Sequence, residues 1–374
     1  MTSRSKNDSV YQAAKTTDSA SGTCKRMPMV TIRDVAAMSG ASIKTVSRVL
    51  NNEPNVRPEM RERVLQAAHK LNYHPNMAAR SLAGRQSYMI GLFYENPSPN
   101  YVVNIQTGAL DRLRGEPYRL LMFPVENFKE FHGKMIAIIR SSGLAGVILT
   151  PPLSNDPEIM DELDQSGVPY VRVAGTEPRP GSPCVAIKDM IAAREMTRYL
   201  LGLGHRRIAF LRGNPVHPAS NARFEGYCYA LQSAGIPIDP DLVIAGDFRF
   251  ASGLEAARKI FALNPRPTAV FSSNDDMAAG IVQAAHEHGI AVPRQLSVVG
   301  FDDSQLASIV WPRITTMRQP ISAMAYTATD IILNLLENGW NTEEIRNVEL
   351  DHALIIRDSA GPPFLANVAE KEDA

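Results

Sequence analysis

Seven short apolar runs separated by amphipathic helical windows are the feature that most constrains the fold of this 374-residue chain. The runs are MIGLFY (89–94), RLLMFP (119–124), AGVILT (145–150), YVRVAG (170–175), RIAFLRG (207–213), AVFSSN (269–274) and LSVVGFD (296–302). Strands that are apolar throughout are typical of parallel sheets, which helices cover on both faces. The pattern therefore predicts a doubly wound α/β body, in which ligands bind beyond the carboxyl ends of the strands.

The charge is balanced over the whole chain but unevenly distributed along it. Lysine plus arginine and aspartate plus glutamate each number 39. Between Lys25 and Ser87 there are eleven basic and four acidic side chains, whereas the chain from Tyr88 onward has 25 basic and 33 acidic ones. A basic segment on a mildly acidic body is expected when one part of a protein meets the phosphates of a nucleic acid.

The stretch TIRDVAAMSGASIKTVSRVLNN, from Thr31 to Asn52, predicts two short helices joined by a tight turn. Thr31 and Asp34 have the spacing of a capping box, and Gly40 can take the positive φ at which a helix ends. Ser42 then caps a second helix, and a third begins at Pro58. We therefore predict an all-α helix-turn-helix domain over residues 28–75, with its second helix in the major groove of DNA. The alternative is a small helical domain whose polar face is merely solvated.

A two-turn helix from Asn76 to Ala83, ended by Gly84, is predicted within a hinge and linker at residues 76–87. A helix shorter than about 12 residues is marginal by itself in water. We expect two such helices, one from each subunit of a homodimer, to order in the minor groove with Leu82 wedged between base steps. An ordinary interdomain linker is the alternative interpretation.

The remaining features predict a cytoplasmic protein of a reducing compartment. Only three cysteines occur, Cys24, Cys184 and Cys228, which is too few for a disulfide framework or a zinc site. Residues 1–27 are expected to be a disordered tail, and they lack the apolar core of a signal peptide. No later stretch has 18 uninterrupted apolar residues, so no membrane partner is expected.

Seven motifs, taken in order, resemble the lactose-repressor/galactose-repressor (LacI/GalR) family of bacterial transcription regulators. They are TIRDVAAMSGASIKTVSRVLNN, LNYHPNMAARSLAG, LGLGHRRIAFLRG, FSSNDDMAAG, LSVVGFDDS, ITTMRQP and ALIIRDS. The resemblance spans Val30 to about Ser359. It implies a regulator of carbohydrate genes that binds a pseudo-palindromic double-stranded DNA operator as a homodimer, nucleoid-associated when bound, and responds to a small sugar-like effector.

The resemblance places base-reading positions at Ile43 and Lys44, because a lysine can donate to guanine and an isoleucine can contact a thymine methyl. Further contacts with bases or phosphates are expected from other polar groups of the helices, and the hinge is expected to contribute its own. The complete expected DNA-binding set is Thr31, Ser42, Ile43, Lys44, Thr45, Ser47, Arg48, Asn51, Asn76, Ala79 and Leu82.

The family also implies that residues 88–361 form an effector-binding and dimerisation domain of two lobes, similar to periplasmic sugar-binding proteins. The chain is expected to cross between the lobes near His205, Gln319 and Asp351. Lobe 1 would then comprise about residues 88–204 and 320–350, and lobe 2 about 205–319 and 351–361. Residues 362–374 form a C-terminal tail without the heptads of a tetramerisation helix.

Polar groups that follow predicted strands identify the candidate effector cleft. An arginine and an aspartate suit the hydroxyl pairs of a sugar ring, and an aromatic ring suits its apolar face. The residues expected to contact the effector are Tyr101, Arg223, Phe248, Asn274 and Asp302. Tyr101 is equally plausible as a core residue, and Asp275 is expected to be the N-cap of a helix rather than a ligand contact.

Lys188 departs from the family pattern, in which an acid is common at this position. Either Asp189 takes over the role of that acid, or the rim of the cleft carries a different charge.

Catalysis is not expected. The acidic pairs Asp275–Asp276 and Asp302–Asp303 are adjacent on single loops, whereas glycosidase carboxylates approach a bond from two sides. No GxSxG, HExxH or Walker motif occurs, and no cofactor or metal is implied. Two alternatives remain open, a transcriptional activator and a corepressor-dependent regulator that senses a purine. The sequence determines neither the position of the operator nor the identity of the effector.

Overall fold

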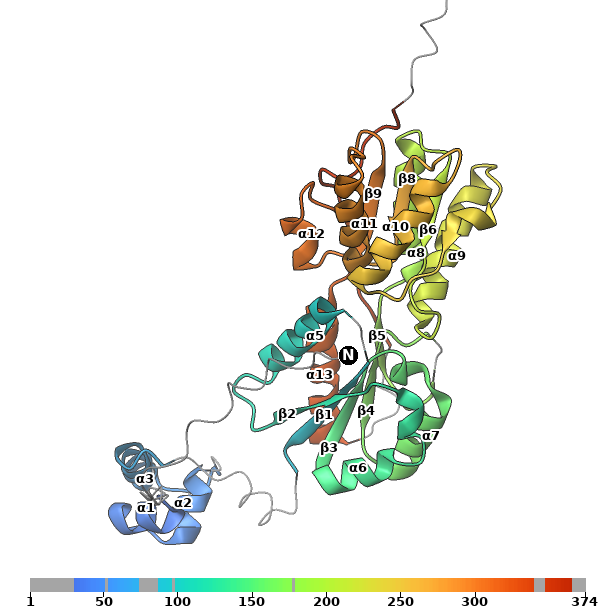
Figure 1. Cartoon of the computed structure of the whole chain (residues 1–374). Helices are drawn as coiled ribbons and strands as arrows, with labels where there is room; N and C mark the ends of the chain where they lie inside the picture. The colour runs from blue at the N-terminus through green and yellow to red at the C-terminus, as the bar shows by residue number, and fades with distance from the viewer. Residues whose placement is uncertain are drawn as a thin grey trace, which may run out of the picture. The chain divides into compact units, whose positions relative to one another are not determined.

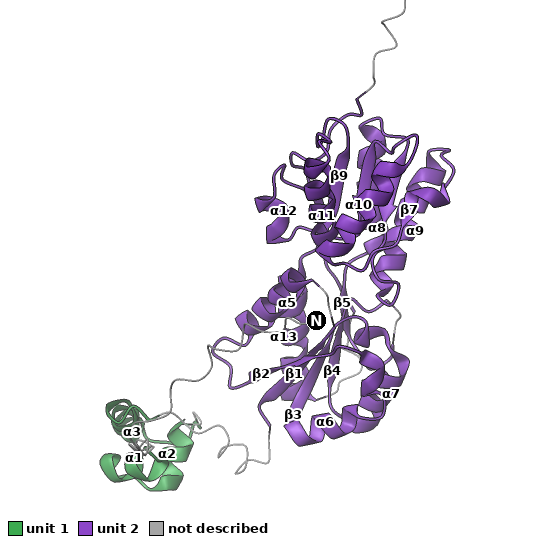
Figure 2. Ribbon diagram, in the orientation of Figure 1, with its two compact units in different colours: residues 1–84 green, residues 85–374 purple. Residues whose placement is uncertain are grey.

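The computed structural model describes residues 30–50, 53–73, 87–95, 98–176, 179–339 and 347–364. The chain forms two compact units, residues 1–84 and 85–374, coloured separately in Figure 2. Several expectations concern residues outside the described ranges: the tail at 1–27, Asn51, nearly all of the hinge with Asn76, Ala79 and Leu82, and most of the C-terminal tail.

The described part of the first unit contains three helices, α1 (Ile32–Ser39), α2 (Ile43–Leu50) and α3 (Pro58–Lys70). The Asp34 carboxylate accepts from the Thr31 amide (2.7 Å) and hydroxyl (2.8 Å), and Gly40 has a φ of 65°. The Thr45 amide donates to the Ser42 hydroxyl at 3.1 Å, which caps α2. These helix boundaries are the ones that the sequence predicts.

One small apolar core holds these helices together. Each helix contributes one face to it, and the fully buried members are Val35, Ala36, Val46, Val49, Val64, Ala67 and Ala68. Because this core is small, the unit depends on its capping bonds as well as on burial.

The second unit contains two six-stranded sheets (Figure 1). The first has the order β11-β5-β4-β3-β1-β2 and the second β12-β10-β9-β8-β6-β7. All described pairings are parallel except that of β10 with β12. The strands of the first sheet are β1 (Met89–Tyr94), β2 (Arg119–Pro124), β3 (Leu144–Leu149), β4 (Tyr170–Val173), β5 (Cys184–Ala186) and β11 (Val348–Glu349). Those of the second are β6 (Ile208–Leu211), β7 (Val243–Ile244), β8 (Ala269–Ser272), β9 (Ser297–Asp302), β10 (Thr315–Arg318) and β12 (Ala353–Ile355).

Helices cover the sheets of both lobes, as Figure 1 shows. The first lobe has α5 (Pro99–Arg112), α6 (Met135–Ser142), α7 (Pro157–Ser166) and α13 (Ile321–Asn338). The second has α8 (Asp189–Gly202), α9 (Pro218–Ser233), α10 (Phe250–Ala262), α11 (Asp275–Glu287) and the short α12 (Gln305–Ile309). Three 3₁₀ turns, Phe128–Phe131, Leu153–Asn155 and Pro240–Leu242, complete the described helical segments. The two-lobed α/β prediction is confirmed, and all seven predicted strands form.

The first crossing between the lobes lies earlier than expected. Helix α8 packs on α9 and on strands β8, β10 and β12, which belong to the second lobe. The chain therefore crosses between β5 and α8, near Lys188, and not near His205. His205 instead bridges two parts of the second lobe, since its ring nitrogens lie 2.9 Å from the Thr268 hydroxyl and the Gly361 carbonyl. The other crossings follow β10, at Gln319, and β11, near Asp351.

Close approach of α8 and α9 generates a stability prediction. A Cβ added to Gly226 would lie 2.2 Å from the Met190 carbonyl oxygen and 2.9 Å from the Ala193 Cβ. We expect Gly226→Ala to lower the free energy of unfolding by about 1–3 kcal/mol, because the two helices must separate. Gly202→Ala, at a helical position with no atom within 4 Å, is the matched control and should not destabilise. Urea unfolding measures both, and equal effects would contradict the packing argument.

Candidate functional site

Helix α2 presents a polar, basic face on the surface of the first unit. Ile43 is 46% exposed, and Ser42, Lys44 and Arg48 are also exposed, while Val46 and Val49 point into the core. Thr45 and Ser47 are half-buried at the edge of this face. An exposed isoleucine beside a lysine at the start of a helix is the arrangement that major-groove reading needs.

Arg48 is less available than the sequence suggests. Its Nε lies 3.4 Å from a carboxylate oxygen of Glu53, and both side chains are about half exposed. Such a pair contributes little to stability in water. Arg48 must leave Glu53 before it can contact a phosphate or a base.

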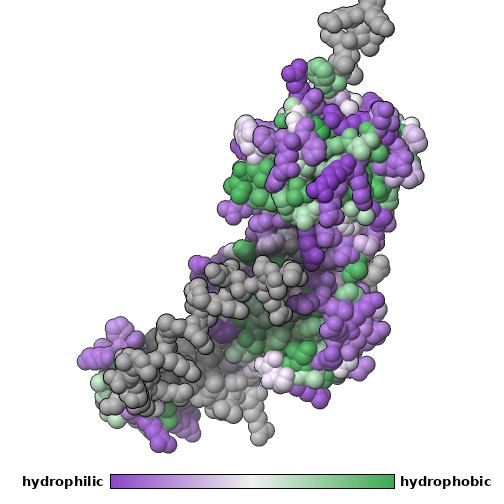
Figure 3. All heavy atoms as spheres, viewed as in Figure 1, coloured by the Kyte–Doolittle hydropathy of each residue, from purple (hydrophilic) through white to green (hydrophobic). Residues whose placement is uncertain are grey.

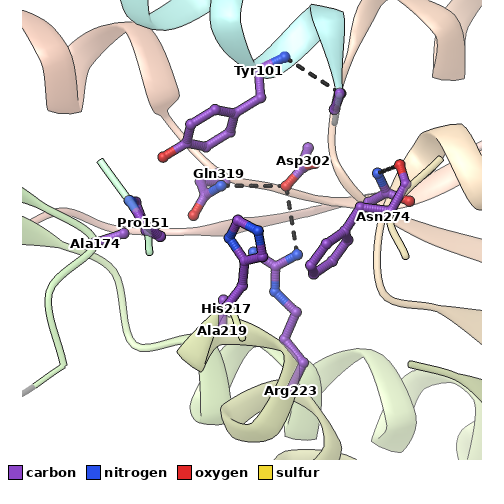
Figure 4. A pocket seen from close by; sticks show the side chains of 11 residues that line it. Tyr101, Pro151, Ala174, His217, Ala219, Arg223, Asn274, Asp302 and Gln319 are labelled. Atoms are coloured by element: carbon purple, nitrogen blue, oxygen red, sulfur yellow. Dashed lines mark hydrogen bonds and ion pairs between the residues drawn. The ribbon is translucent and has the colours of Figure 1, made fainter. Parts of the chain in front are cut away.

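In the second unit a cleft lies beyond the carboxyl ends of the strands. The space between its walls, with the open solvent at its mouth included, is about 440 Å³. It is lined by Ser98, Tyr101, Pro151, Ala174, His217, Ala219, Arg223, Phe248, Asn274, Asp302 and Gln319. The structure thus brings together all five residues that the sequence places at the effector. In Figure 4 Arg223 and His217 point from the α9 side toward Asp302 and Gln319, and Tyr101 points in from α5.

Arg223 is held rigidly at the floor of this cleft. Its Nε donates to Asp189 at 2.8 Å, and its Nη1 donates to the Ser273 carbonyl at 2.6 Å. Its guanidinium lies 3.6 Å from the centre of the Phe301 ring, a cation–π contact. Only about 5% of the side chain is exposed. The charge is therefore pre-positioned and does not need to be ordered by a ligand.

Asp302 is the second charged group of the cleft. Its Oδ1 lies 3.7 Å from the Arg223 Nη1 and accepts from the Gln319 amide at 3.3 Å. Burial raises the pKa of Asp302 well above its usual range, the Arg223 charge opposes that rise, and Asp275 adds to it. A ligand that donates to this carboxylate would satisfy an acceptor that the protein leaves poorly solvated.

Asn274, not Asp275, caps α11, which corrects the sequence expectation. The Asn274 side-chain oxygen accepts from the Met277 amide at 3.0 Å, while its amide nitrogen donates to the Phe248 carbonyl at 2.8 Å. Asp275 is the first helical residue and is fully buried. It accepts from the Thr316 hydroxyl at 2.6 Å and the Ser304 amide at 2.7 Å. Asp275 does not cap the helix because its side chain turns inward toward β9 and β10, whereas Asn274 both caps α11 and lines the cleft.

Phe248 forms an aromatic wall together with His217. Its ring packs so closely on Gly213 that a Cβ there would lie 1.9 Å from the Phe248 Cζ. The His217 ring meets Phe248 edge-on, with centroids 5.5 Å apart and an interplanar angle of 88°. A flat apolar face and a polar edge therefore lie side by side.

Asp189, and not Lys188, lies beside Arg223 at the cleft. Lys188 pairs with Glu349 at 2.7 Å, on a half-exposed surface, while Asp189 takes the pairing with Arg223. Lys188 is not among the described residues that line the cleft.

Sequence reasoning missed six lining residues: Ser98, Pro151, Ala174, His217, Ala219 and Gln319. Ala174 and Gln319 directly follow strands, and Ser98 and His217 directly precede helices, so the rule that placed Asn274 and Asp302 could have found these four. Ser98 also links the lobes, since its hydroxyl donates to Asp276 of α11 at 2.7 Å. No pattern in the sequence pairs residues so far apart.

Within the described ranges no group of three or more His, Cys, Asp or Glu side chains could hold a metal ion. A search of the helices in those same ranges finds none with the length and apolarity needed to span a membrane.

Comparison with known proteins places each unit in a known class. Residues 31–76 match the model of bacterial regulatory proteins of the lacI family, and residues 197–360 match a periplasmic binding protein-like domain. Catabolite control protein A of Priestia megaterium is 31% identical over 333 residues, which cover 88% of this chain and 99% of that protein.

Two solved structures share the fold along most of the chain. The Lac repressor dimer bound to operator and the anti-inducer ONPF superposes with a TM-score of 0.76 at 27% identity, covering 89% of this chain and 99% of that one. The regulator CelR in complex with cellobiose has a TM-score of 0.67 at 29% identity, with coverages of 88% and 100%.

These similarities define a DNA-binding transcriptional regulator with a binding-protein-like body, and not an enzyme. The chain belongs to the lacI family of bacterial regulatory proteins.

Asp275 generates a prediction about pH. Burial raises the pKa of Asp275 from 3.8 to about 7. Between these values the folded protein keeps a proton that the unfolded chain releases, so the contribution of Asp275 to the free energy of unfolding falls as pH rises and levels off above about 7. In Asp275→Asn the side-chain oxygen can still accept from the Ser304 amide, and its NH₂ group can donate to the Thr316 oxygen once that hydroxyl, which donates to Asp275 in wild type, rotates away. The stability of Asp275→Asn relative to wild type should therefore increase from pH 5 to pH 7 in urea unfolding. A difference that does not change with pH would contradict the shift.

Proposed function

We propose that this protein represses carbohydrate uptake or catabolism genes and that a small sugar-like effector, bound in the cleft of the second unit, controls its hold on DNA. The observation that carries the proposal is the convergence of Tyr101, Arg223, Phe248, Asn274 and Asp302 on one cleft. Their chemistry suits a polyol, because fixed donors and acceptors lie beside an aromatic face. The cellobiose bound to CelR supports the same ligand class.

The first unit would read the operator. The exposed Ile43 and Lys44 would meet base edges, and Thr31, Ser42, Thr45, Ser47 and Arg48 would contribute further base or phosphate contacts. The contacts proposed for Asn51, Asn76, Ala79 and Leu82, including a minor-groove wedge in the hinge, rest on the sequence alone. The protein would act in the bacterial cytoplasm, associated with the nucleoid when bound to DNA.

A homodimer would match a pseudo-palindromic operator. Apolar side chains gather at the edge of the second lobe over α12 (Figure 3), where Ile309 is 69% and Trp311 78% exposed. An exposed apolar edge of this kind marks an association surface. The Lac repressor, which resembles this chain along most of its length, is a dimer on its operator.

Effector and operator would communicate through the relative position of the two lobes. The crossing at Gln319 lines the cleft, and Ser98 bonds to Asp276 of the opposite lobe at 2.7 Å. A ligand that changes this closure also changes how the first lobes of a dimer hold the hinges. A coupling of about 1–3 kcal/mol, or 5–150-fold in operator affinity, is typical of such systems.

Lys44 tests base reading in the first unit. Lys44→Ala should weaken binding to the operator more than binding to random duplex, because a base contact discriminates by about 1–3 kcal/mol. Lys70→Ala, which removes the same charge from the end of α3, is the matched control and should preserve sequence preference. Fluorescence anisotropy with both duplexes measures the ratio, and an unchanged ratio in Lys44→Ala would refute its role.

Asp302 tests the effector cleft. The effector is first identified as the compound that most raises Tm in a screen of sugars and nucleobases. Asp302→Asn should then bind that compound about 10–100-fold more weakly, because the amide replaces one acceptor oxygen by a donor and leaves a buried ligand hydroxyl unpaired, which costs about 1–3 kcal/mol. The exposed Asp241→Asn serves as the control. Isothermal titration calorimetry measures the affinity of each variant for the compound. If Asp302→Asn binds it as tightly as wild type does, the cleft is wrongly assigned.

A further inference from the structure

The charges around the cleft do not favour an anionic ligand. Among the described lining residues, Arg223 is the one with a guanidinium and Asp302 the one with a carboxyl group. Behind them Asp189 pairs with Arg223, and Asp275 and Asp276 lie close enough to raise the pKa of Asp302 further. Acidic groups therefore outnumber the single guanidinium around the cleft, and Asp189 already balances the charge of Arg223.

The guanidinium of Arg223 is already paired and hydrogen-bonded within the protein. Its Nε and Nη1 donate to Asp189 and to the Ser273 carbonyl, and Asp302 lies 3.7 Å from Nη1. A phosphate or carboxylate beside this arginine would approach two carboxylates as well. The start of α9 also faces the cleft, but a helix N-terminus contributes only about half an elementary charge. Its first residue, Pro218, has no N–H to donate.

His217 offers the cleft a polar group that nothing in the described protein satisfies. The side chain is only 3% exposed, and its Nε2 has no hydrogen-bond partner among the described residues. Burial, and then the neighbouring Arg223, lower the pKa of His217 to about 4, so the ring is neutral at physiological pH. A neutral imidazole gives a hydrogen bond without attracting charge. A buried polar atom without a hydrogen-bond partner costs free energy, so a ligand that hydrogen-bonds to Nε2 removes this cost when it binds.

We infer that the cleft selects an uncharged polar ligand, bound through His217 Nε2 and Asp302, and rejects phosphorylated and carboxylated sugars. His217 is the residue at which this charge selection can be changed. The inference rests on the proposed role of the cleft as the effector site and narrows its ligand class.

The test places a cation at position 217. Wild type, His217→Arg and a control, His286→Arg, which makes the same change on the exposed face of α11, are each mixed with glucose 6-phosphate. The reference for each protein is glucose with sodium chloride at the same ionic strength. We expect the phosphate ester to raise the Tm of His217→Arg by about 2 °C or more and to leave wild type and His286→Arg unchanged.

Two results would overturn the inference. If glucose 6-phosphate stabilises wild type as much as His217→Arg, the cleft already accepts anions. If it stabilises neither protein, charge at position 217 does not govern entry. If the circular dichroism spectrum of His217→Arg shows that this variant is not folded like wild type, the inference is tested with the wild-type protein alone. Stabilisation by galacturonate or glucose 6-phosphate above that by galactose or glucose contradicts the inference, and the absence of such an excess supports it.

Operator binding separates this inference from the proposed function. A protein that recognises operator DNA but prefers an anionic sugar would overturn only the charge selection. A protein that binds no duplex selectively would overturn the proposed function, while the Tm comparison would still report on the cleft.

Discussion

The buried guanidinium of Arg223 is the constraint on which the cleft proposed to bind the effector depends. A buried charge is tolerated only when it is paired and hydrogen-bonded. Its partners come from three places along the chain: Asp189 at the start of α8, Ser273 after β8, and Asp302 at the end of β9. Because all three lie in the second lobe, the arginine gathers the ends of two strands and a helix into one rigid polar floor. A ligand therefore meets groups that are already oriented, which lowers the entropy cost of binding.

The first lobe forms the other wall of the cleft, and its contacts with the floor are few and polar. Tyr101 and Ser98 approach from the start of α5, and the Ser98 bond to Asp276 is a direct link between the lobes. Gln319 belongs both to a crossing and to the cleft, and it bonds to Asp302. Under the proposed function, a change in how a ligand engages Asp302 would be transmitted directly to a segment that joins the lobes. The sparse contact between two well-packed bodies is what lets ligand free energy alter their relative position.

The sequence predicts most of this architecture and part of the site. Long apolar runs identified seven strands, and Thr31, Gly40 and Ser42 bounded the first helices, because local chemistry determines these features. The strands of two or three residues, β5, β7, β11 and β12, were not predicted because they are too short to have a periodicity of their own. The sequence did not show that α8 belongs to the second lobe, or that Asn274 rather than Asp275 caps α11. Both features depend on tertiary packing. His217 was missed for the same reason, since its importance lies in burial and an unpartnered nitrogen.

The account as a whole requires that the intact protein prefer one duplex sequence and that a ligand of the cleft change that preference. The most direct measurement is the affinity of the full-length protein for DNA upstream of its own gene and for a shuffled duplex of the same length. It is made across a range of salt concentrations, with and without the compound that most raises Tm. We expect tighter binding to the upstream DNA, a steep decline with salt, and a shift in affinity on adding the compound. Equal affinity for both duplexes at moderate salt, unaffected by the compound, would contradict the account.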